Sequence, residues 1–148
     1  MTDTVTMLAS VGYVQSKYEN LISDLNGDFM INYLDYALEI PRAAPLTYSL
    51  AFNVDGNLGS WRTITRISYY HRDKSYYNEN NQGYINKQDI LNFGYDVYSP
   101  NGKINVGIYG KNLSNEVKHG GDTNLSFGGT FAPLAKGKVV GAEVVYKF

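Results

Sequence analysis

The sequence predicts an all-β protein whose strands form an antiparallel up-and-down meander of about six strands. Its 148 residues include 14 tyrosines, 6 phenylalanines and 15 glycines, and only 18% are charged. Aromatic side chains fit the surface of a pleated sheet, and glycines supply tight turns. Several segments also alternate apolar and polar residues with a period of two, which does not suit an amphipathic helix. Together these observations favour strands over helices.

The clearest predicted strand covers residues 46–54. Its alternate residues form one apolar face: Leu46, Tyr48, Leu50, Phe52 and Val54. The residues between them are Thr47, Ser49, Ala51 and Asn53, so the other face is nearly polar. The closing segment, residues 139–148, has the same period and places Val140, Ala142, Val144, Tyr146 and Phe148 on one face. Both segments are typical of strands with two different environments.

Turn residues separate the remaining predicted strands. Asn101-Gly102 lies between apolar alternations at residues 91–97 and 104–108, and this dipeptide favours a type I′ hairpin turn. The glycines of residues 55–60 predict another tight turn, followed by a strand over residues 61–70. Residues 5–18 are interpreted as the first strand of the set.

The connections between these strands alternate in length. Short turns are expected at residues 55–60 and 99–103, and long connections at residues 19–44, 74–86 and 114–137. Outer-membrane barrels combine short periplasmic turns with long extracellular loops, although a soluble meander can show the same rhythm. In the first long connection, apolar residues at helical spacing (30–38) suggest a short helix, but Pro41 and Pro45 favour irregular loop.

Composition excludes several classes of function. The net charge of −1 with scattered basic residues argues against a nucleic-acid partner, and no apolar run is long enough for a membrane helix. Met1–Ser10 contain no secretory signal. The only histidines, His71 and His119, are far apart and cysteine is absent, so we expect no metal site. No nucleophile with a base and no phosphate-binding loop are found, so we expect no catalytic residue, no cofactor and no enzyme.

Charged residues of the predicted strands are expected on the inside of a barrel. Arg62, Arg66 and Arg72 share one face of residues 61–72, and an arginine facing lipid near the bilayer midplane costs roughly 2–4 kcal/mol. We therefore expect these side chains in the lumen, together with Asp96 and Lys111 from neighbouring strands. Pairing among these charges is a simpler expectation than contact with a solute.

Four segments resemble one known family. Residues 40–50 (IPRAAPLTYSL) resemble the entry to a late strand of TonB-dependent receptors, and residues 108–116 (IYGKNLSNE) are similar to the end of another strand in that family. Residues 128–133 with 141–148 look like its final loop and strand, and residues 10–18 resemble an earlier strand. The resemblance implies that residues 1–148 are the C-terminal portion of such a receptor's transmembrane β-barrel, without the plug domain and earlier strands.

The resemblance also implies a function and partners. These receptors lie in the bacterial outer membrane and take up a scarce solute, typically a ferric siderophore, through a barrel of roughly 22 strands that holds a plug. The TonB complex and the plug domain would be partners only of the full-length protein. Outer-membrane lipid and the barrel assembly machinery would be partners of this segment, because the family's assembly signal matches Val144, Tyr146 and Phe148. Solute contacts are expected from the long loops, at Tyr76, Tyr77, Tyr84 and His119.

Two other classes remain open at this stage. About six strands are fewer than the roughly eight that close a small barrel, so the segment alone is not expected to transport. A small self-contained β-sandwich, or a barrel closed by oligomerisation, would instead act as a binding module. A barrel hydrolase ranks third. Monomeric behaviour in buffer without detergent would favour the sandwich.

Overall fold

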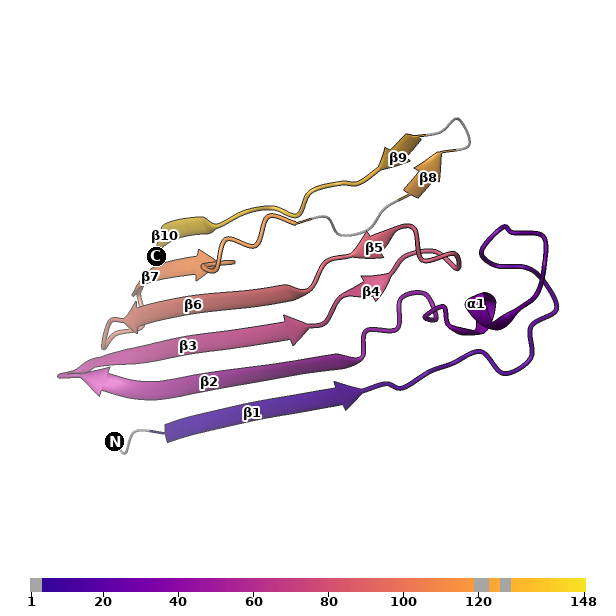
Figure 1. Cartoon of the computed structure of the whole chain (residues 1–148). Helices are drawn as coiled ribbons and strands as arrows, with labels where there is room; N and C mark the ends of the chain where they lie inside the picture. Colours follow the sequence, from indigo (N-terminus) through magenta and orange to yellow (C-terminus); the bar gives the residue numbers. More distant parts are fainter. Residues whose placement is uncertain (1–3, 119–122, 126–128) are drawn as a thin grey trace.

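The computed structural model describes residues 4–118, 123–125 and 129–148. Six strands form one antiparallel sheet in the order β1-β2-β3-β6-β7-β10, so each strand pairs with its neighbour in the meander (Figure 1). The strands are β1 (Thr4–Tyr13), β2 (Leu46–Leu58), β3 (Trp61–Arg72), β6 (Gln88–Tyr98), β7 (Ile104–Lys111) and β10 (Val139–Tyr146). The predicted all-β meander of six strands is therefore confirmed.

The long connections lie together at one end of the sheet (Figure 1). They carry the helix α1 (Tyr33–Tyr36) and two small hairpins, β4 (Ser75–Tyr76) with β5 (Tyr84–Ile85), and β8 (Thr123–Leu125) with β9 (Gly129–Phe131). The short turns lie at the opposite end, on the left of Figure 1, where both chain termini are also found. The two ends of the sheet thus differ in the length of their connections, as the sequence predicts.

Both short turns differ in detail from the predicted ones. Strand β2 continues to Leu58, which pairs with Trp61, so the first turn contains only Gly59 and Ser60. Gly59 has a φ of 63°, and a positive φ at the first turn residue is what a type II′ turn requires. Gly56 is a strand residue and not part of this turn.

The predicted type I′ turn at Asn101-Gly102 is wrong. The amide of Gly102 donates to the carbonyl oxygen of Ser99 at 2.9 Å, so Pro100 and Asn101 are the central residues of the turn. Only Gly102 has a positive φ, of 67°. The reason is Pro100, because its ring fixes φ near −65° and favours the second position of a type I turn.

Two other local predictions need correction. The first strand ends at Tyr13 and not at residue 18. The connection after it contains the one-turn helix α1, where the sequence favoured irregular loop. Asn32 caps this helix by accepting from the amide of Leu34, and the side chain of Asp35 accepts from the amide of Asn32. Such a reciprocal capping box stabilises even a short helix.

The six-stranded sheet is open and has no second layer among the described residues. Strands β1 and β10 each pair on one side only, so the sheet does not close into a barrel. Ala44 and Ile85 are the only buried apolar residues of the described part. A sheet of this length ordinarily buries one face against another element. The stability of this sheet therefore depends on an apolar environment, or a further part of the protein, that covers its exposed apolar side chains.

A glycine at the end of β7 makes room for the chain that follows. The side chain of Leu113 lies over Gly110, and a Cβ at Gly110 would be 2.5 Å from Leu113 Cδ2 and 3.0 Å from its Cγ. The backbone of Leu113 is held in place, since its amide donates to the carbonyl oxygen of Leu91 at 2.7 Å.

We expect Gly110→Ala to lower the free energy of unfolding by roughly 1–3 kcal/mol through overpacking against Leu113. Urea unfolding of the purified protein would measure the change. In a Leu113→Ala background the same substitution should cost much less, because the obstructing side chain is gone. An equal cost in both backgrounds would contradict this account.

Candidate functional site

The register places most apolar strand residues on one face of the sheet. Phe52 pairs with Met7 on one side and with Ile67 on the other, and Ile67 in turn pairs with Phe93. In another row of paired residues on the same face, β6, β7 and β10 bring together Val97, Val106 and Val144. We call this surface the apolar face. Of its strand residues only His71 and Asp89 carry an acidic or basic side chain, and both lie beside the long connections.

The apolar face is open to its surroundings. Phe52 and Leu50, in the middle of β2, are each 38% exposed, and Val144 on β10 is 70% exposed. Isolated apolar residues are common on protein surfaces, but a contiguous apolar area that spans six strands marks an interaction surface. The apolar side chains are not folded inward on one another as a dry interior in the described residues.

A polar cluster ends the apolar face beside the long connections. The imidazole Nδ1 of His71 lies 2.6 Å from Asp89 Oδ1, and its Nε2 lies 3.1 Å from Asp73 Oδ1. The hydroxyl of Tyr69 donates to Asp89 at 2.7 Å, and the ring of Tyr48 stacks on His71 with centroids 4.7 Å apart. The two ionisable groups of this face, His71 and Asp89, are thus paired where the face ends. The sequence did not predict the cluster, because its members come from strands that are distant in the chain.

The opposite face of the sheet carries the charges, and we call it the polar face. The register places Arg62, Arg66, Arg72, Asp96 and Lys111 on it, as expected from the alternation. Arg62 forms an ion pair with Asp55, and Arg66 forms one with Asp96. The guanidinium of Arg72 donates to the hydroxyl of Ser75 at 2.8 Å. Each of the three arginines is therefore paired with a neighbouring side chain.

Gly107 on the polar face leaves space for the carboxylate of Asp96, which pairs with Arg66. Arg66 extends over Gly94, where an added Cβ would be 3.6 Å from the arginine Nε. Gly107 lies opposite Asp96, and a Cβ there would be 2.6 Å from the carboxylate. Beside Gly94 is a shallow depression of about 460 Å³, lined among others by Arg66, Asn92 and Lys111. This hollow presents cationic and amide groups to any solute on the polar face.

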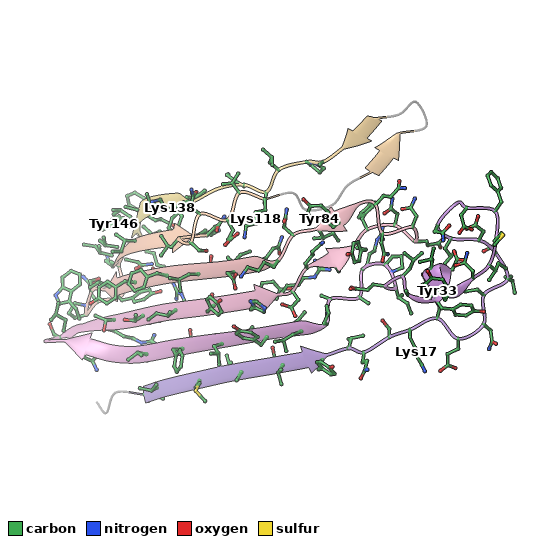
Figure 2. All side chains as sticks on the ribbon, in the orientation of Figure 1. Lys17, Tyr33, Tyr84, Lys118, Lys138 and Tyr146 are labelled. Carbon is green, nitrogen blue, oxygen red and sulfur yellow. The ribbon has the colours of Figure 1, made fainter. Side chains whose placement is uncertain are left out.

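The C-terminal residues continue the apolar face of β10. Val144 and Tyr146 pair with Val106 and Ile104, and Phe148 follows beyond the strand with a fully exposed side chain. The rings of Tyr146 and Phe148 meet edge to face with centroids 5.1 Å apart. Figure 2 shows Tyr146 at the short-turn end of the sheet. The three residues of the expected assembly signal therefore share one exposed face at a free sheet edge.

The expected solute-contact tyrosines are brought together by the β4–β5 hairpin. Tyr76 pairs with Tyr84 across it, and the ammonium of Lys74 lies over both rings, 4.7 Å and 4.6 Å from their centroids. Arg42 lies over the ring of Tyr77 at 4.8 Å. These rings are thus engaged by cations of the chain itself. His119 lies outside the described residues.

A carboxylate cluster in the first long connection was not predicted from the sequence. Asp24, Asp28 and Asp35 place one carboxylate oxygen each within 4.8 Å of one another. The expectation that the chain holds no metal rested on histidine and cysteine alone. The signal that could have revealed the cluster is the spacing of acidic and amide residues in residues 24–35.

Comparison of the chain with protein-family models, with curated proteins and with solved structures finds no match. In the described part of the chain, no helix is long and apolar enough to cross a membrane.

Proposed function

We propose that this chain is a section of the wall of a bacterial outer-membrane β-barrel of the TonB-dependent receptor type. In this proposal the apolar face contacts outer-membrane lipid and the polar face lines the lumen. The full-length protein would take up a scarce solute, such as a ferric siderophore, with energy from the TonB complex. The observation that carries the proposal is the segregation of residues between the two faces of one open sheet.

The dimensions of the strands support a membrane-spanning sheet. A transmembrane β-strand needs about 9–11 residues. Strands β1, β6, β3 and β2 have 10, 11, 12 and 13 residues, and β7 and β10 have 8 each. The arginines of β3 lie on the polar face, where they avoid the cost of exposure to lipid. A self-contained binding module would have to cover the apolar face, and within the described residues no second layer does so.

The two free edges agree with a segment of a larger wall. Unpaired backbone N–H and C=O groups are costly in lipid, and only closure of a barrel removes them. Strands β1 and β10 would therefore pair with further strands of the receptor. Because six strands alone leave these edges open, the segment by itself would not form a pore.

Labelling of introduced cysteines tests the orientation of the sheet in cells that produce the protein. The chain has no cysteine, so a single substitution gives one reactive thiol in this region. Gln82 is an exposed residue in the connection between β4 and β5, and Ser60 is an exposed residue of the turn between β2 and β3. We expect a membrane-impermeant maleimide to label Gln82→Cys in intact cells and Ser60→Cys only after the outer membrane is permeabilised.

Fractionation of the same cells provides the second measurement. The protein should be recovered with the outer membrane and should require detergent for extraction. Recovery in a soluble fraction, or equal labelling of both cysteines in intact cells, would refute the proposed topology. The parent protein without an introduced cysteine controls for labelling of other parts of the receptor.

A further inference from the structure

Residues 24–35 of the first long connection contain a pattern that the proposed transport function does not use. In the sequence DLNGDFMINYLD, Asp24, Asn26, Asp28, Asn32 and Asp35 occupy positions 1, 3, 5, 9 and 12. The twelve-residue calcium loop of EF-hand proteins takes its ligands from these positions and from the backbone carbonyl at position 7, here that of Met30. The pattern includes amide residues at the right places, so it is more specific than a group of acidic residues.

The loop is folded so that its carboxylates converge. One oxygen each of Asp24, Asp28 and Asp35 lies within 4.8 Å of the other two. Asp24 accepts from the amides of Gly27 and Phe29 at 2.8 Å and 2.7 Å, which curls the loop around its first residue. Like charges at such distances repel one another. A cation bound between the three carboxylates would attract each of them and offset their mutual repulsion.

Asp35 is the most buried of the three aspartates. The residue is wholly buried, and its carboxylate accepts from three backbone amides, those of Leu25, Asn26 and Asn32. In residues 4–118, no lysine, arginine or histidine forms an ion pair with any of the three aspartates. A buried charge is costly unless it is paired or coordinates a metal.

The loop departs from the EF-hand pattern at three points. Position 6, ordinarily glycine, is Phe29, yet Phe29 has the positive φ of 68° that favours glycine. Position 12 is aspartate in place of glutamate. A helix, α1, begins at Tyr33 within the loop (Figure 2), but none precedes Asp24 in the described chain. Phe29 therefore keeps the sharp turn of position 6, although a positive φ is unfavourable for a residue other than glycine.

We propose that residues 24–35 bind one Ca²⁺ ion. Asp24, Asn26, Asp28 and Asp35 supply side-chain oxygens, Met30 supplies its backbone carbonyl, and Asn32 contributes directly or through a water molecule. Hard oxygen ligands with three carboxylates suit Ca²⁺. The bound ion would hold the connection between β1 and β2 in one conformation at the long-connection end of the sheet. The site depends only on this loop, so it does not require the barrel proposal to be correct.

Isothermal titration of the purified full chain in detergent with CaCl₂ tests this site. We expect saturable binding of one ion, with a Kd on the order of 10⁻⁵ to 10⁻³ M, the range between calcium sensors and extracellular modules. Asp24→Asn and Asp28→Asn keep the shape of each side chain and remove one charge. Each should weaken binding by roughly tenfold or more, since the number of charged ligands sets the affinity of such loops.

Glu19→Gln is the matched control. Glu19 is an exposed acidic residue of the same connection and lies outside the pattern. Its neutralisation removes the same charge and should leave the Kd unchanged. The absence of saturable binding at millimolar CaCl₂, or an equal loss of affinity in Glu19→Gln, would overturn the proposal. Circular dichroism of each variant verifies that the β-sheet is intact.

Discussion

Phe52→Arg should destabilise the membrane-inserted protein by roughly 2–4 kcal/mol, the largest effect on stability that we expect from a single substitution. Phe52 lies in the middle of β2, on the apolar face, between Met7 and Ile67. In the proposed barrel this position faces lipid, where a guanidinium finds no water and no counter-charge. The urea midpoint of the receptor in lipid vesicles would measure the loss, and its recovery from the outer membrane should fall in parallel.

Ala51→Arg is the control for this prediction. Ala51 precedes Phe52 in β2, so it lies at the same depth but faces the other way, between Leu8 and Ser68 on the polar face. An arginine there reaches the wet side of the sheet and should cost less than about 1 kcal/mol, as surface substitutions do. Equal losses in both variants would mean that the two faces do not differ in environment. A harmless Phe52→Arg would exclude contact with lipid.

Phe148→Ala should abolish most of the assembly of the protein into the outer membrane and change its stability little. In the structure, Phe148 is fully exposed and its aromatic contact is the ring of Tyr146. Such a pair contributes about 0.5–1.5 kcal/mol, too little to explain a failure to fold. A large loss in cells would therefore report recognition of the C-terminal residue by the assembly machinery.

Two measurements on the same variant separate recognition from stability. The amount of heat-modifiable, membrane-inserted protein in cells should drop sharply for Phe148→Ala, whereas the urea midpoint after refolding in detergent should stay close to that of the parent. Lys147→Ala is the neighbouring control, because it changes the residue next to Phe148 and keeps the amide that donates to the carbonyl oxygen of Lys103. If Lys147→Ala assembles as poorly, the terminal phenylalanine is not the signal.

The sequence by itself determined the six strands and the division of their residues between two faces. Alternation is a local property, so Leu50, Phe52 and Val54 share a face in any strand that contains them. Glycine and proline likewise located both short turns, although Pro100 changed the type of one of them. The lengths of the connections followed from the strand boundaries without any knowledge of the sheet.

Only the tertiary structure decided which distant residues meet. Arg66 reaches Asp96 on the neighbouring strand, and Tyr48, Tyr69, His71 and Asp89 form one cluster, because the register of three strands brings them side by side. Loop conformation was likewise beyond local patterns, as α1 and the β4–β5 hairpin show. The physical reason is that alternation fixes the side on which a side chain lies, whereas its partners depend on register and on backbone hydrogen bonds between segments far apart in the chain.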